Sequence, residues 1–388
     1  MWKTVSLSDV CNVSIGKTPP RGDKLYWDEE KITNNVWLSI ADLSSSNDKY
    51  ISDSKEYLSN EGASLFKSVP KNTLIMSFKL SIGKLAFTKC ELRTNEAIAA
   101  LSILDESLVL KEFLYYYLSS LNWDVLAGHN QKVKGKTLNK KKLNALEITL
   151  PPLSEQQRIV AKLDAAFAEI DEAVENANTK EFEINKLQAS ILSASLSTNA
   201  IKSELNPITE LCNDIYAGGD APAKVNISKV KTKKYKTPIY SNGVKDSGLY
   251  GYTTFEPRTL QPAITISARG TIGHIEVRNK PFLPIVRLIV LEPKIEKIDL
   301  NFLKFALLSM KIFSSGSSIP QLTIPMLKKM NLSLPPLAEQ KQIVKKLNTA
   351  YREFENISIF IEKSRQSYKS LKSAILAQEL QSSQGKVA

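Results

Sequence analysis

Two segments of the chain share a pattern: a serine, a basic residue, a hydroxyl residue and an Ile-Gly pair. They read IMSFKLSIGKLAF at 75–87 and ITISARGTIGHIEV at 264–277. The glycine lets a backbone turn come close to another molecule, and a long cation beside it can reach a phosphate or a guanine edge. We therefore predict DNA contacts from Lys79, Lys84, Arg269 and His274. The alternative is a hairpin turn common to both segments, whose charges are merely exposed.

Lysine-rich runs and a few separate residues extend this set. Lysines that contact phosphates contribute affinity and salt dependence, but no sequence selectivity. The lysines of the two runs are Lys132, Lys134, Lys136, Lys231, Lys233 and Lys234. Four other residues are candidates for base contacts: Arg21, Tyr240, Asn242 and Lys245. The alternative for the two runs is an ordinary solvated surface.

The residues offer little to a catalytic mechanism. The GKT triplets at 16–18 and 135–137 lack the glycine five residues upstream that a phosphate-binding loop needs. The histidines, His129 and His274, fall in different predicted domains, which disfavours a Ser/His/Asp or Cys/His device. The three cysteines are widely spaced and follow no metal-ligand pattern. We predict no catalytic residue, no cofactor and no metal.

A block that begins Leu-Pro-Pro-Leu occurs twice and must form the elements that position these residues. The copies at 150–196 and 334–380 share 16 identities over 47 gap-free positions. Pro-Pro ends the preceding strand-like run and favours a helix start, for which Ser154 is the expected N-cap in the first copy. Neither copy contains Pro or Gly after this start. Each therefore predicts one helix on the order of 65 Å long.

Apolar residues in both copies recur at alternating steps of four and three, which is typical of coiled coils. The residues that we predict to pack between the helices are Leu163, Ile170, Leu187, Leu347, Phe354 and Leu371. The Ala-rich seam of the first copy suits the larger seam of the second, so we expect the helices to pack on each other within one chain. The alternative is two independent dimerisation helices.

Each helical block follows a globular segment with short β-rich stretches, and the two segments resemble each other faintly. The order is globular, helix, globular, helix, which indicates a tandem duplication. We predict an α+β protein with two mixed α/β domains at 1–149 and 201–333 and long helices within 150–200 and 334–388.

The net charge of +12 is unevenly distributed. Residues 201–333 hold 19 Lys and Arg against 10 Asp and Glu, whereas residues 150–200 hold 4 against 8. A basic globular part beside an acidic helix points to a polyanionic partner for the globular part only. No apolar run approaches the roughly 18 residues of a membrane span, and the N-terminus lacks a signal-peptide pattern, so we expect a cytoplasmic protein.

The paired LPPLxEQ blocks, each after a divergent globular segment, resemble the specificity subunit of type I restriction-modification enzymes. The opening VSLSDVCNVSIGKTPPRGD is also similar to the start of a target-recognition domain, with LCNDIYAGGDAP as a looser counterpart. The resemblance covers nearly the whole chain. It implies that each globular domain reads one half of a bipartite site in double-stranded DNA, while two long antiparallel helices set the spacer between the halves. It also implies two methyltransferase (modification) subunits and motor-nuclease (restriction) subunits as partners, and no catalytic centre in this chain.

Other classes stay open from the residues alone. A coiled-coil protein–protein adaptor without DNA specificity would bind an acidic protein in a salt-insensitive way. An enzyme would transfer methyl groups without an added subunit. A specificity subunit of a different restriction class would differ only in its partners.

Overall fold

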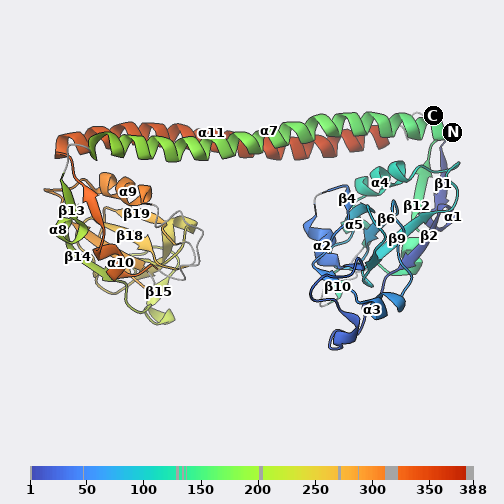
Figure 1. Cartoon of the computed structure of the whole chain (residues 1–388), viewed down its shortest axis with the longest axis horizontal. Coiled ribbons are helices and arrows are strands. Elements are labelled where there is room, and N and C mark those ends of the chain that lie inside the picture. The colour runs from blue at the N-terminus through green and yellow to red at the C-terminus, as the bar shows by residue number, and fades with distance from the viewer. Residues whose placement is uncertain are drawn as a thin grey trace. The chain divides into compact units, whose positions relative to one another are not determined.

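The structure is a computed structural model. It describes residues 2–46, 48–127, 131–132, 135–136, 138–200, 204–269, 272–286, 288–310 and 322–381, with backbone only for 127, 131–132, 135–136, 198–200 and 381. The chain divides into two compact units, of which the first comprises Met1–Asn176 with Ser364–Ala388 and the second comprises Ala177–Lys363 (Figure 1). Each unit holds one globular domain and a part of each long helix. No helix in the described ranges is both long and apolar enough to cross a membrane.

The globular domain of the first unit is built on two sheets with strand orders β2-β9-β6-β7-β4 and β5-β3-β8. Its strands are β1 (Lys3–Ser6), β2 (Cys11–Ile15), β3 (Val36–Leu38), β4 (Tyr50–Ile51), β5 (Glu56–Tyr57), β6 (Leu74–Ser77), β7 (Leu85–Thr88), β8 (Arg93–Thr94), β9 (Ile98–Ile103), β10 (Gln131–Lys132), β11 (Gly135–Lys136) and β12 (Glu147–Leu150). Its short helices are α1 (Leu7–Val10), η1 (Lys24–Tyr26), α2 (Ile40–Ser45), α3 (Asn60–Ser64), α4 (Lys111–Ser120), α5 (Trp123–Ala127) and α6 (Lys140–Asn144).

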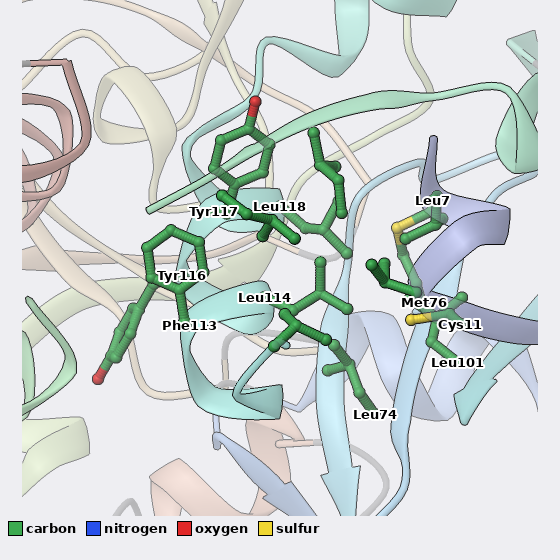
Figure 2. Packing of buried hydrophobic residues seen from close by; sticks show 14 of the residues in the cluster. Leu7, Cys11, Leu74, Met76, Leu101, Phe113, Leu114, Tyr116, Tyr117 and Leu118 are labelled. Atoms are coloured by element: carbon green, nitrogen blue, oxygen red, sulfur yellow. The ribbon is translucent and has the colours of Figure 1, made fainter. Parts of the chain in front are cut away.

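The main core of this domain lies between the larger sheet and α4. Strand residues such as Leu74, Met76 and Leu101 face Phe113 and Leu114 of the helix, and all are at most 1% exposed (Figure 2). Successive side chains of a β-strand point to opposite faces of the sheet. Leu74 and Met76 are two positions apart and Leu101 lies on the neighbouring strand, so all three lie on one face. The similar segments FLYYYLSS at 113–120 and FLKFALLS at 302–309 predict a short amphipathic helix in each domain, and both helices are confirmed.

The globular domain of the second unit has sheets with orders β14-β21-β18-β19 and β15-β17-β16-β20. Its strands are β13 (Leu205–Pro207), β14 (Cys212–Ala217), β15 (Ile227–Ser228), β16 (Thr237–Tyr240), β17 (Leu249–Thr253), β18 (Ala263–Ser267), β19 (Ile275–Arg278), β20 (Leu283–Pro284), β21 (Leu288–Pro293) and β22 (Asn331–Ser333). Its short helices are α8 (Ile208–Leu211), η2 (Lys224–Asn226), η3 (Lys245–Gly248), α9 (Leu300–Ser309) and α10 (Ile324–Lys328).

The two domains repeat one topology. The order β2-β9-β6-β7 in the first matches β14-β21-β18-β19 in the second, with the same antiparallel pairings. In the smaller sheets, β3 and β16 both pair in parallel with a later strand and antiparallel with another. The predicted fold class and internal duplication are therefore confirmed.

Each domain is closed by its own end strands. In the first domain β1 pairs antiparallel with β12, so that Lys3 lies opposite Leu150. In the second, β13 pairs with β22, and Leu205 lies opposite Ser333. The strand that opens each domain therefore lies beside the strand that leads into the following long helix.

The long helices α7 (Leu153–Ala200) and α11 (Leu337–Gln381) begin directly after the two prolines of each repeated block. The prediction that Ser154 caps the first helix is wrong. The carbonyl of Pro152 already accepts the first helical hydrogen bond, from the Gln156 amide at 3.0 Å, so Ser154 lies inside the first turn. Pro336 and Gln340 repeat the same bond at 3.0 Å in the second helix.

A buried glutamine fixes each helix start to its domain. Gln156 is fully buried; its Oε1 accepts from the Leu110 amide at 2.9 Å, and its Nε2 donates to the carbonyls of Leu108 and Pro151, both at 2.9 Å. Gln340, also fully buried, repeats the set: Oε1 accepts from the Asp299 amide at 2.8 Å, while Nε2 donates to the carbonyls of Lys297 and Pro335 at 3.1 and 2.8 Å. Every buried polar atom of these two side chains is thus used.

The helices run antiparallel against each other within each unit. In the first unit, Lys162 Nζ lies 2.6 Å from Glu379 Oε1, and Lys372 forms an ion pair with Asp171. Moving forward along α7 therefore means moving backward along α11. In the second unit, Gln188 of α7 lines one cavity together with α11 residues on either side of Phe354. The predicted pairing of the helices within one chain is confirmed.

The predicted seam between the helices is correct only in part. Leu163 and Leu347 are fully buried, and Ile170 and Phe354 are 6% and 8% exposed. The prediction is wrong for Leu187 and Leu371, which are 51% and 46% exposed.

The reason for this error is a one-residue shift in each seam. In α7 the covered positions run through Ala173, Ala177 and Glu181, two successive steps of four, so that Gln188 rather than Leu187 lies on the covered face further along. In α11 a similar shift near the helix start places Lys372 rather than Leu371 on the covered face. An α-helix of 3.6 residues per turn drifts against a strict seven-residue repeat, and an extra step of four is the usual correction.

Candidate nucleic-acid interface

The first repeated turn joins β6 to β7. The Ser77 amide donates to the Lys84 carbonyl at 2.9 Å, and the Lys84 amide donates to Ser77 Oγ at 3.0 Å. Gly83 has φ of +84°, and a Cβ there would run into the Trp123 indole, so only glycine suits this position. Lys84 is exposed, and Lys79 Nζ lies 5.2 Å from the centre of the Phe78 ring. The predicted pair of lysines thus flanks one tight, rigid turn.

The second repeated turn joins β18 to β19 and shares two backbone bonds with the first, in which the Gly83 amide also donates to the Ser77 carbonyl, at 2.9 Å. The Ser267 amide donates to the His274 carbonyl at 3.0 Å, and the Gly273 amide donates to the Ser267 carbonyl at 3.1 Å. Gly273 has φ of +82°, which matches Gly83. Arg269 is exposed, whereas Thr271 of the shared pattern lies outside the described residues. The sequence pattern therefore identifies one turn that both domains share. Both interpretations of the pattern, a set of DNA contacts and a hairpin turn with exposed charges, expect this result.

The two turns differ in the charge that they present. His274 Nε2 lies 3.3 Å from Glu276 Oε1, and only 24% of the His274 side chain is exposed. Lys304 Nζ of α9 lies 4.0 Å from the other oxygen of Glu276. His274 therefore faces a carboxylate, whereas Lys84 at the matching position is exposed.

Arg21 is held by other side chains of the first domain. Its guanidinium lies 4.5 Å from the Trp27 ring centre and 4.6 Å from the Trp37 ring centre, and it forms an ion pair with Glu56. The two indoles meet edge to face with centroids 5.1 Å apart. A base contact by Arg21 would have to compete with these interactions, although 53% of its side chain is exposed.

The lysine runs differ in how much of them is described. Lys134 lies outside the described residues, and Lys132 and Lys136 are described by their backbone alone, in β10 and β11. The other run connects β15 to β16, where all its predicted members are exposed: Lys231, Lys233 and Lys234. Exposed lysines on a connection are free to reach a phosphate, and this part of the prediction is geometrically feasible.

The remaining candidates of the second domain surround the loop after β16. Tyr240 is half-buried; its ring packs against Phe282 with centroids 5.5 Å apart, so its ring is structural. Asn242 Oδ1 accepts from the Arg269 amide at 3.5 Å, and its Nδ2 donates to the Arg269 carbonyl. Lys245 is exposed. The structure therefore brings Asn242 and Arg269 together, although 27 positions separate them.

Arg278 is a residue of this region that sequence reasoning missed. It is 7% exposed, its guanidinium carbon lies 3.7 Å from the Tyr240 ring centre, and its Nη2 donates to the Ser247 carbonyl at 2.6 Å. Burial lowers the pKa of Arg278. An arginine at the end of a strand usually faces solvent, so the sequence offers no signal for this placement.

Among the described residues, no cluster of His, Cys, Asp and Glu could hold a metal ion. Burial raises the pKa of Cys11 and Cys212 to about 12, so these thiols are neutral and unreactive near neutral pH. The arrangement is one of exposed cations on rigid turns, which suits binding to a polyanion.

Comparison with known proteins agrees with this arrangement. A putative type I specificity subunit of Mycoplasma pneumoniae is 32% identical over 229 residues, covering 59% of this chain and 61% of that protein. A second one from the same organism is 38% identical over 150 residues, covering 38% and 43%. The Escherichia coli EcoBI specificity subunit is 28% identical over 170 residues, covering 43% and 34%. The matches thus span less than two thirds of these relatives.

One solved structure shares the fold over the full length. Its description is the structural basis underlying complex assembly and conformational transition of the type I R-M system. It matches with a TM-score of 0.75 at 19% identity and covers 98% of this chain and 97% of that one. The family model for the type I restriction modification DNA specificity domain matches residues 1–180 and again residues 201–362. With both halves matched and one topology repeated in both, the chain belongs to the family of type I restriction-modification DNA specificity domains.

Proposed function

We propose that this chain is the DNA-specificity subunit of a type I restriction-modification complex, and that each globular domain reads one half of a bipartite site. The observation that carries the proposal is the family match to both halves of the chain, together with the topology that both domains repeat. Two readers joined in one chain multiply their selectivities, since each wrong base pair costs roughly 1–3 kcal/mol. Target-recognition domains at 1–149 and 201–333 form part of the proposal.

The chain itself carries no catalytic centre in this proposal. Methyl transfer and cleavage belong to its partners, which are two methyltransferase subunits and motor-nuclease subunits, and the complex acts on double-stranded DNA in the cytoplasm. The failed GKT motifs and the buried, neutral thiols of Cys11 and Cys212 support a binding role.

DNA contact is proposed for the exposed cations of the two turns, above all Lys84 and Arg269, and for the run at 231–234. The second domain carries the larger positive charge, so we expect it to contribute more of the salt-dependent affinity. Because Lys84 is exposed where His274 faces a carboxylate, the two domains are expected to read different half-sites.

The test is to sequence the methylated motif in cells that carry this chain with its methyltransferase subunit. We expect a bipartite motif with two unlike halves. Replacing residues 201–333 with those of a relative should change one half only. A change in both halves, or methylation without any sequence preference, would contradict the proposal and favour an adaptor role.

The length of the helix pair is proposed to set the spacer between the halves. The ion pairs of Lys162 with Glu379 and of Asp171 with Lys372 give the register, which places 174–180 opposite 362–368. Deleting both segments shortens the pair by about 10 Å, or about three base pairs of DNA. The methylated motif should keep its half-sites and change its spacer, whereas an unchanged spacer would rule out this role for the helices.

A further inference from the structure

The two domains share a frame but differ in the connection that follows β3 and β16. After β3 the chain forms α2, which is capped by its own residues: the Ser39 amide donates to Asp42 Oδ2 at 3.0 Å, and the Asp42 amide donates to Ser39 Oγ at 3.3 Å. After β16 the chain instead forms the 241–248 loop, in which Asp246 and Ser247 have φ of 50° and 51°. Two consecutive non-glycine residues in the left-handed region persist only where surrounding contacts hold them.

The guanidinium of Arg278 fixes the position of this loop. Its Nη2 donates to the Ser247 carbonyl at 2.6 Å, its Nε donates to Thr265 Oγ1 at 3.1 Å, and its guanidinium stacks on Tyr240. With the repeated turns aligned, the first domain has Thr88 at this position. Thr88 donates to the Pro70 carbonyl at 2.7 Å, within its own hairpin. The buried arginine is therefore a feature of the second domain alone.

A second set of bonds ties the base of the loop to the repeated turn. Asn242 exchanges hydrogen bonds with the backbone of Arg269, and the Gly243 amide donates to Ser267 Oγ at 3.4 Å. The Ser241 amide donates to the Gly248 carbonyl at 2.9 Å, which closes the loop. Gly248 has φ of +77°, and a Cβ there would lie 2.6 Å from the Ser241 carbonyl oxygen, so the closure requires glycine.

The tip of the loop is exposed although its base is fixed. Val244 is 54% exposed, and Lys245, Asp246 and Ser247 are exposed as well. The tip thus presents a cationic donor beside an anionic acceptor on a backbone that loses little freedom on binding. Lysine suits the O6 and N7 acceptors of guanine and aspartate suits the N4 donor of cytosine, so this pair matches the edge of a G·C base pair in the major groove.

We infer that the 241–248 loop is the base-reading element of the second domain and that Arg278 is its positioning residue. The inference rests on the proposed function, because it assigns a DNA contact to one of the two domains. It explains why an otherwise repeated frame carries a buried arginine in one copy only. In this inference Asn242 does not contact a base directly. Its hydrogen bonds instead join the loop to the turn that bears Arg269.

The test uses the full chain together with its methyltransferase subunit and compares methylated motifs. Lys245→Ala removes a tip donor without touching the fold, and we expect selectivity at one or more positions of the second half-site to drop roughly 10-fold. Arg278→Met removes the support and should relax the same half-site while the first half-site stays unchanged. Arg258→Met is the matched control, because Arg258 stacks 4.4 Å from the Tyr216 ring centre and donates to the Ala217 carbonyl at 3.1 Å, outside the loop. Its motif should stay that of the parent.

The outcomes separate this inference from the function on which it rests. If the parent chain yields a bipartite motif but Lys245→Ala leaves the second half-site unchanged, the inference is wrong and the proposed function stands. If Arg258→Met relaxes the half-site as much as Arg278→Met does, the positioning role is wrong. Should Arg278→Met give too little folded protein, Lys245→Ala alone decides, since its side chain is exposed. A parent chain without any bipartite motif would overturn both.

Discussion

Replacing Gln156 with methionine should destabilise the first unit by about 3 kcal/mol. Methionine has a similar length but neither donates nor accepts comparable hydrogen bonds. The change removes three bonds of 2.9 Å and leaves the Leu110 amide and the carbonyls of Leu108 and Pro151 without their partner. Each bond contributes about 1 kcal/mol net, and an unsatisfied buried group costs at least as much. Gln340→Met should cost the second unit a similar amount, because its three bonds are equivalent.

Urea unfolding followed by circular dichroism measures this prediction. With a slope of about 2 kcal/mol/M, the midpoint of the affected transition should fall by about 1.5 M. Gln157 and Gln342 are exposed neighbours in the same helix starts, so their methionine variants are matched controls that should stay within about 0.5 kcal/mol of the parent. The double variant should show both losses independently, since the two sites lie in different units. A loss below about 1 kcal/mol for Gln156→Met, or one equal to that of its control, would refute the view that these glutamines anchor the helices.

Further predictions concern the seam, the thiols and the lysine run. Leu163→Ala should cost about 2–5 kcal/mol in urea unfolding because the side chain is fully buried, whereas Leu187→Ala, at a site 51% exposed, should cost no more than about 0.5; equal losses would contradict the shifted seam. The free energy of unfolding should fall as pH rises from about 9 toward about 12, because the unfolded chain releases the thiol protons of Cys11 and Cys212 that the folded chain retains, their pKa values being raised to about 12. Urea titrations at about pH 8 and about pH 10.5 should show a smaller fall in the alanine variants of these cysteines, and an identical fall would count against burial of the thiols. Replacing the lysines within 231–234 by alanine should lower the slope of log affinity against log salt by about 0.9 per lost phosphate contact, as measured by fluorescence anisotropy with duplex DNA; an unchanged slope would remove this run from the interface.

The sequence alone was sufficient for the duplication, the long helices and the two turns. The helices were predictable because the repeated blocks are colinear and contain no residue that ends a helix. The turns were predictable because Gly83 and Gly273 both need a positive φ, so the pattern around them had to persist. These features depend on local chemistry that the spacing of residue types records.

Features that depend on distant neighbours were not predictable. In α7 the seam was predicted correctly at Leu163 and Ile170 but not at Leu187, because the spacing of apolar residues does not mark where the extra step of four falls. The contacts of Arg21 were not predictable, because the indoles of Trp27 and Trp37 beside its guanidinium meet only in the folded domain. Arg278 gave no signal because a buried arginine at a strand end is stabilised by a stacked ring and a carbonyl from other segments.

The pairing of β1 with β12 has a consequence for the order in which the chain folds during synthesis. Lys3 emerges from the ribosome early, but its partner Leu150 is made much later, and the same holds for Leu205 and Ser333. A contact between residues so far apart in sequence is slow to form and leaves the opening strand unpaired in the meantime. Each domain can close only when translation has passed the strand that leads into the following helix. Nascent chains stalled before residue 147 should therefore stay sensitive to proteases near their N-terminus. Because the first domain is translated first, it is also the first that can close.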